Sequence, residues 1–223
     1  MKGYTLKEID LLKLYPKIKR DTEARAKTKT EKQKSIALKF GWEYFDKKGI
    51  CYNGYFYDGR WVPIVQRFID YFNIKDGMKI LDVGCAKGYM LYDFKNALPN
   101  LDLHGVDISE YAIQSCPTEV KDCLQIANAN DLSIFNSDEF DVVFAINSIH
   151  SFKTIDETKI AVSEIQRVSK GKSYIIVDAY NNQEEKKRME QWQVAGHMVL
   201  SETQWIKIFE EVSYTGDYFW FKP

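Results

Sequence analysis

The chain has 223 residues, of which 45% are hydrophobic and 28% are charged, a balance typical of a globular protein with one sizeable core. The formal net charge is −1, so the composition as a whole gives no argument for nucleic-acid binding, and no apolar run is long enough to span a membrane. The N-terminus lacks the apolar core of a signal peptide, and the four cysteines and three histidines form no zinc pattern. We therefore expect a cytoplasmic protein without a metal site.

The first part of the chain is rich in lysine and arginine. Residues from about Arg20 to Leu38 predict one exposed helix, in which Glu23 and Glu31 interleave with the basic residues. This interleaving favours a solvated helix face over a nucleic-acid surface. We therefore expect no nucleic-acid partner.

Between Phe40 and Trp61 the composition changes abruptly to aromatic residues and glycines, with neither a helical nor a strand period. The segment either covers the edge of a sheet or forms a lid over a ligand, and the two roles can coexist. We place a boundary after Trp61. Residues 1–61 form an N-terminal helical and aromatic extension, and residues 62–223 form the main domain.

The main domain alternates between strand and helix patterns. Val62 to Phe72 has helical spacing, and a Ser-capped helix runs from Ser201 to about Val212. Strands are expected near 79–83, 102–107, 123–127, 140–146, 173–179 and 217–221, and helices at about 88–97, 109–115, 156–168 and 183–196. This alternation predicts an α/β fold with a mostly parallel, doubly wound sheet and helices on both faces.

The most informative stretch is ILDVGCAKGYML, residues 80–91. An apolar strand ends at Asp82, and a turn of small residues through Gly84, Cys85 and Gly88 leads into a helix. Glycines let the backbone approach a ligand closely. A carboxylate at this place would repel a pyrophosphate, so we expect a ligand that offers hydrogen-bond donors or positive charge.

This stretch resembles the first motif of the class I S-adenosylmethionine (SAM)-dependent methyltransferases, acidic-x-Gly-x-Gly-x-Gly, with Ala86 at the middle glycine. The dinucleotide fingerprint Gly-x-Gly-x-x-Gly fits less well, because Ala86 and Tyr89 replace two of its glycines. Three further matches follow in order over roughly residues 60–180. They are the strand ending at Asp107, the segment IANA where the family usually has Gly-Asp-Ala, and the segment FDVVFAINSIH.

The resemblance implies SAM as the cofactor and a role for each matching residue. Asp82 would hold the ammonium group of SAM, Asp107 would accept hydrogen bonds from the ribose hydroxyls, and Asn128 would accept one from the adenine amino group. Arg60 would bind the cofactor carboxylate, or would instead pair with Asp58 or Asp46. The complete set of expected cofactor residues is Arg60, Asp82, Gly84, Cys85, Gly88, Asp107, Ile108, Asn128, Ala129 and Asn147.

His150 follows the fourth strand, where the family has its reaction centre. It is the preferred general base because imidazole titrates near neutral pH, with a structural role as the alternative. The expected substrate residues are Tyr55, Tyr57, Tyr180 and His197. Members of the family usually end the sheet with an antiparallel hairpin. The tail is short here, so we expect one of the two hairpin strands to be shortened.

The leading interpretation is a methyltransferase that acts on a small-molecule acceptor, such as a sugar or another metabolite of cell-surface glycan or secondary metabolism, by in-line methyl transfer. The Asn/Asp-Pro-Pro-Tyr signature of amino-group methylation is absent, and Asn147-Ser-Ile-His150 stands in its place. The alternatives are an NAD(P)-dependent oxidoreductase and a non-catalytic SAM-binding module. The oligomeric state is left open.

Overall fold

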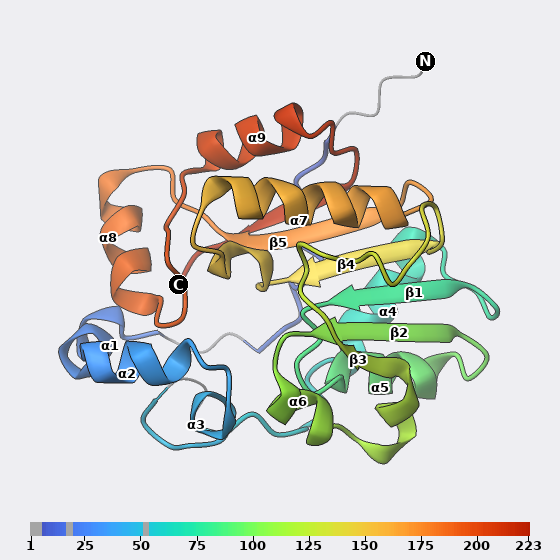
Figure 1. The fold of residues 1–223 in the computed structure, drawn as a ribbon, viewed down its shortest axis with the longest axis horizontal. Coiled ribbons are helices and arrows are strands. Elements are labelled where there is room, and N and C mark those ends of the chain that lie inside the picture. Colours follow the sequence, from blue (N-terminus) through green and yellow to red (C-terminus); the bar gives the residue numbers. More distant parts are fainter. Residues whose placement is uncertain (1–5, 17–19, 51–53) are drawn as a thin grey trace.

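The computed structural model describes residues 6–16, 20–50 and 54–223. Within them, six parallel strands form one sheet in the order β3-β2-β1-β4-β5-β6 (Figure 1). The strands are β1 Lys79–Val83, β2 Asp102–Asp107, β3 Leu124–Ile126, β4 Val142–Ile146, β5 Ser173–Asp178 and β6 Asp217–Phe221. The strand order reverses between β1 and β4, and open α/β sheets bind ligands at the carboxyl ends of strands beside such a reversal. The predicted doubly wound sheet is confirmed.

Helices cover both faces of the sheet (Figure 1). One face carries α4 Val62–Phe72, α5 Tyr89–Ala97, α6 Glu110–Gln114 and the 3₁₀ turn η1 Thr118–Cys123, and the other carries α7 Ile155–Val168 and α9 Glu202–Glu211. Alternate strand residues face opposite sides, so Phe144 packs edge-on against Phe68 of α4 while Val143 and Ala145 join the core under α7. The two cores make the sheet a rigid support for the loops at its carboxyl edge.

The basic extension folds back onto that edge. It contains α1 Thr22–Thr28, α2 Glu31–Ala37 and α3 Trp42–Phe45. In Figure 1, α1 and α2 lie beside α8 Gln183–Trp192, on the side toward which the strands point, and α3 lies below α2. The prediction of one exposed helix was wrong, because the chain is extended at Lys29 and Thr30 starts a second helix with a capping box. The helices are also docked, since the Thr22 hydroxyl donates to the side-chain oxygen of Gln191 at 2.9 Å.

The last strand corrects a second expectation. β6 pairs parallel to β5, with Ile175 beside Tyr218, and does not form the end of an antiparallel hairpin. The helices α8 and α9 carry the chain back across the sheet, so β6 enters from the same end as β5. The outer edge of β6 pairs with the start of the chain, where Ile9 N donates to Tyr218 O at 2.9 Å and Tyr218 N donates to Lys7 O at 3.0 Å.

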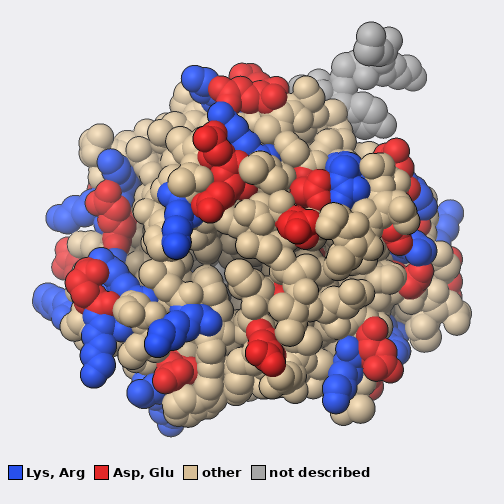
Figure 2. Space-filling view, in the orientation of Figure 1, with Lys and Arg blue, Asp and Glu red and all other residues tan. Residues whose placement is uncertain are grey.

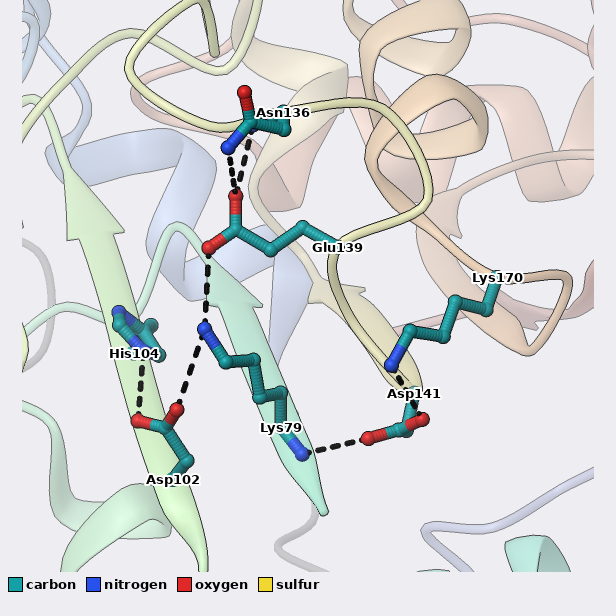
Figure 3. Close-up of polar contacts among 7 residues, drawn as sticks. All are labelled: Lys79, Asp102, His104, Asn136, Glu139, Asp141 and Lys170. Atoms are coloured by element: carbon teal, nitrogen blue, oxygen red, sulfur yellow. Dashed lines mark hydrogen bonds and ion pairs between the residues drawn. The ribbon is translucent and has the colours of Figure 1, made fainter.

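A polar network joins the amino ends of the central strands, at the edge opposite the strand termini discussed below (Figure 3). Lys79 at the start of β1 lies 3.4 Å from Asp102 at the start of β2 and 3.3 Å from Glu139 before β4. The other members drawn are His104, Asn136, Asp141 and Lys170. Among the described residues no group of acidic, cysteine or histidine side chains is arranged to hold a metal ion. None of the helices in these residues has the length and apolar character needed to cross a bilayer.

Candidate active site

The turn after β1 is held in an unusual backbone conformation. Gly84, Ala86 and Gly88 all have positive φ, at 84°, 50° and 68°. A Cβ atom at Gly84 would lie 2.2 Å from the Cβ of Ser148, and one at Gly88 would lie 2.8 Å from a methyl carbon of Leu124. Both glycines are therefore required by close packing as well as by backbone conformation, whereas Ala86 adopts the left-handed region at an energetic cost.

Asp82 is the penultimate residue of β1 and lines a pocket of about 300 Å³, counted with its open mouth. Its side chain is nearly buried, and the described residues give its carboxyl group no hydrogen bond or ion pair. Burial, followed by the charge of Asp107, raises the pKa of Asp82 well above its usual range. The other lining residues are Tyr55, Trp61, Gly84, Cys85, Met90 and Ile146. A carboxylate without a partner in such a pocket matches a cationic, hydrogen-bond-donating ligand.

Asp107 ends the neighbouring strand β2 and joins two turns. Its Oδ2 accepts a hydrogen bond from Ala86 N at 2.8 Å, and its Oδ1 accepts one from Ser109 N at 2.8 Å. Burial raises the pKa of Asp107, and the hydrogen bonds from Ser109 and Ala86 oppose that shift. The carboxylate therefore stands where the sequence predicts, and it also braces the turn after β1.

Two exposed isoleucines lie next to Asp107. Ile108 follows it directly, and Ile126 ends the adjacent strand β3, with 55% and 56% of their surfaces exposed. Asn128 and Ala129 come after β3, where the amide oxygen of Asn128 accepts a hydrogen bond from Asn130 N at 3.3 Å and Ala129 packs on the core. The ends of β2 and β3 thus present an apolar surface next to a polar turn, which suits a flat heteroaromatic ring.

The segment after β4 brings two predicted residues and one that sequence reasoning missed. The Asn147 amide oxygen and the His150 Nδ1 are buried, and within the described residues neither has a hydrogen-bond partner. His150 Nε2 lies 3.6 Å from Oδ2 of Asp178, which ends β5. Burial raises the pKa of Asp178, and the charge of His150 opposes the shift. The signal for Asp178 was available, because it ends a buried strand as Asp107 does.

The aromatic segment packs over the start of α5. The Tyr55 ring stacks on Tyr89 with ring centroids 5.2 Å apart, and the Tyr57 hydroxyl donates to Asp93 at 2.6 Å. That hydrogen bond raises the pKa of Tyr57 to about 12. The position puts Tyr55 at the wall of the Asp82 pocket. Tyr52, which the sequence analysis places in the same segment, lies outside the described residues.

Lys87 is a further residue that sequence reasoning missed. Its ammonium group lies 2.7 and 2.8 Å from the two carboxylate oxygens of Asp46 and donates to the carbonyl of Tyr55 at 3.0 Å. The Tyr111 hydroxyl also donates to Asp46. An ion pair therefore ties the turn after β1 to the N-terminal extension, whose residue Tyr55 lines the pocket.

The remaining predicted residues lie as follows. Arg60 holds Asp58 with two hydrogen bonds of 2.7 and 2.6 Å, which matches the structural alternative, and its role toward a cofactor carboxylate stays a prediction. Tyr180 follows β5 and contacts the ammonium group of Lys186 through its ring. His197 is exposed in the loop between α8 and α9.

A methyltransferase domain model matches residues 74–215, well over half of the chain. The chain belongs to the class I SAM-dependent methyltransferases. The expected resemblance is confirmed, and the match argues against the oxidoreductase alternative. The boundary after Trp61 lies outside the matched range and stays a prediction.

Individual relatives agree in fold. The uncharacterized protein MJ1252 of Methanocaldococcus jannaschii is 30% identical over 141 residues, or 62% of this chain, and the chain spans about half, 51%, of its length. A Haloferax volcanii methyltransferase solved with the activator Trm112 superposes with a TM-score of 0.53 at 14% identity, over 88% of this chain and 77% of that one. A methyltransferase from an antibiotic biosynthesis pathway of Anabaena variabilis has a TM-score of 0.52 at 22% identity, over 68% and 60%.

SAM is the cofactor of this family, and the site fits it. The carboxyl group of Asp82, which has no partner in the described part of the chain, suits the ammonium group, and the turn at Gly84 leaves no room for a side chain. The apolar surface at Ile108 and Ile126 suits the adenine ring. The assignment of each contact to a residue stays a prediction.

Proposed function

We propose that this protein transfers the methyl group of SAM to a hydroxyl group of a small-molecule acceptor, such as a sugar or another metabolite. The observation that carries the proposal is the pair of His150 and Asp178, with the buried Nδ1 of His150 left without a partner among the described residues. A neutral imidazole that carries its proton on Nε2, the nitrogen that faces Asp178, has its lone pair on Nδ1. That lone pair is suited to accept a proton from a hydroxyl acceptor.

Methyl transfer to a hydroxyl group requires a methyl donor and a base that removes the acceptor proton. When bound, SAM supplies an electrophilic methyl group for in-line displacement. His150 takes the acceptor proton at Nδ1, and the carboxylate of Asp178 holds the ring and stabilises the imidazolium that forms. The Trp205 indole nitrogen donates to the backbone carbonyl of Asp178 at 2.9 Å, which fixes the end of β5.

The enclosure of the site supports a small acceptor. The Lys87–Asp46 pair holds the aromatic segment over the turn after β1, and the Ser109 hydroxyl donates to the carbonyl of Phe40 at 2.5 Å. Together with α8, these contacts wall the carboxyl edge of the sheet.

Replacement of His150 tests the proposal. Against a panel of hydroxyl, amine and acid acceptors, His150→Gln should lower the rate of hydroxyl methylation by about 10²–10⁴-fold, because general-base catalysis contributes that much. Affinity for S-adenosylhomocysteine (SAH) should stay within error of the wild type. His104→Gln, at the opposite edge of the sheet, is the matched control. Normal turnover in His150→Gln would exclude His150 as the base, and SAH binding without methylation of any acceptor would favour a non-catalytic module.

A further inference from the structure

Arg20 lies against the carboxyl edge of the sheet, beside the proposed reaction centre. Its guanidinium carbon is 4.7 Å from the centre of the Phe221 ring and 5.3 Å from the centre of the Trp192 ring. Phe221 ends β6, and its register partner in β5 is Asp178. The two rings therefore place the guanidinium over the ends of the last two strands, near the carboxylate of Asp178.

Among the residues that the structure describes, the guanidinium of Arg20 differs from those of the other arginines in having no polar partner. Arg60 is bound by Asp58, and Arg167 by Glu164. Within the described residues, Arg20 has ring contacts but neither a hydrogen-bond acceptor nor an ion pair. Its side chain is half-buried, and this burial lowers the pKa of Arg20, whereas the charges of Tyr15 and Asp178 oppose that shift. A planar set of five donors that lies over two rings and is only half-buried is suited to bind an oxyanion.

The charge of the N-terminal extension around Arg20 also favours an anionic ligand. Residues 1–61 carry 15 of the 31 basic residues but only 8 of the 32 acidic ones. Figure 2 shows basic side chains, with some acidic ones among them, over the end of the molecule where Figure 1 places α1 and α2. A potential of this sign raises the local concentration of anions. The carboxylate of Asp178 is already engaged, 3.6 Å from His150 and 3.5 Å from the Gln193 amide.

We propose that Arg20 binds an anionic group, a carboxylate or a phosphate, on the methyl acceptor. The substrate is then an acidic small molecule whose hydroxyl group lies at His150 while its anion lies at Arg20. This inference rests on the proposed function and adds the chemical class of the substrate. Arg20 acts as a specificity determinant and takes no part in the proton transfer.

Chemical footprinting tests the anion site without any turnover. The SAH-loaded protein is treated with phenylglyoxal, and modification of the peptide that contains Arg20 is followed by mass spectrometry with sodium phosphate, sodium malonate or matched sodium chloride. For a dissociation constant of about 1 mM, 10 mM anion should slow modification of Arg20 about tenfold. Arg188, exposed on α8, is the internal control and should be modified equally in all three salts. Equal modification of Arg20 in the three salts would overturn the proposal.

Matched acceptors then separate the two anions and the two proposals. Neutral, carboxylated and phosphorylated forms of one hydroxyl compound are compared in wild type, Arg20→Gln, Arg20→Lys and the control Arg188→Gln. Arg20→Gln should lower the preference in kcat/KM for an anionic over the neutral form by about 10–100-fold, with partial rescue in Arg20→Lys. An unchanged preference in Arg20→Gln would contradict the inference while leaving the methyltransferase proposal intact. If wild type methylates none of the forms although phosphate or malonate protects Arg20, the proposed function fails and the anion site stands.

Discussion

The ammonium group of Lys87 contacts both carboxylate oxygens of Asp46, so one ion pair joins the turn after β1 to the N-terminal extension. Lys87 is almost completely buried, whereas a quarter of the Asp46 side chain is exposed. Burial alone raises the pKa of Asp46, but the hydrogen bonds from Lys87 and Tyr111 outweigh it and lower the pKa. The turn after β1 and the segment that carries Tyr55 to the wall of the pocket are thereby coupled.

Asp46→Asn should destabilise the protein by about 2–3 kcal/mol, because it leaves the buried Lys87 charge without its partner. The free energy of unfolding in urea measures this cost, and Asp46→Asn/Lys87→Met should recover part of it. Lys170→Met, which breaks the more exposed pair with Asp141, is the control and should cost less than about 1 kcal/mol. Equal losses of unfolding free energy in Asp46→Asn and the control would show that the Lys87–Asp46 pair does not stabilise the turn.

Ala86 offers a gain in stability. Its φ of 50° is in the left-handed region, which costs an alanine about 1–2 kcal/mol, while glycine enters it freely but loses more entropy on folding. Ala86→Gly should therefore raise the free energy of unfolding by about 0.5–1 kcal/mol, and Ala86→Val should lower it. Thermal and urea unfolding measure the free energy of unfolding of the two variants against the wild type. A stable valine variant that binds SAH normally would show that the turn is neither strained nor in contact with the cofactor.

Asp82 should reduce the stability of the ligand-free protein at neutral pH. The pKa of Asp82 is raised in the folded state. Its contribution to the free energy of unfolding is therefore fully present below about pH 4, the ordinary pKa of an aspartate, and is lost as the pH rises through the folded-state pKa. Asp82→Asn should therefore gain stability over the wild type between pH 4.5 and 7.5, while its SAH affinity falls. Urea unfolding at the two pH values measures the first effect. Parallel pH dependences in the two proteins would mean that the carboxyl group is not desolvated.

The sequence predicts the sheet well because buried strands and glycine turns are local signals. All six expected strands are present, with Asp82 one residue before the end of β1 and Asp107 at the end of β2. Contacts between distant segments leave no local signal. Lys87 and Asp46 are 41 residues apart, and only the docking of the extension brings them together. The parallel pairing of β6 is likewise decided by the path of α8 and α9.

Arg60 illustrates the limit for a single side chain. Its sequence context permits both a cofactor role and a pair with Asp58, two residues away. The structure shows the pair with Asp58. A structure with bound cofactor would decide whether Arg60 also binds the cofactor carboxylate. Arg20 carries even less signal in the sequence, because its partners Trp192 and Phe221 come from the other end of the chain.

Calorimetric titration of SAH tests the central claim most directly. The wild type and the control Asp141→Asn should bind SAH, and NAD should not compete. Asp107→Ala should lose about 1–3 kcal/mol of binding free energy, because the ribose hydroxyls lose a charged acceptor. Circular dichroism and urea unfolding establish that the variant is folded, since Asp107 also braces the turn through Ala86. Failure of the wild type to bind SAH, or unchanged affinity in Asp107→Ala, would contradict a SAM site at the carboxyl ends of β1 and β2.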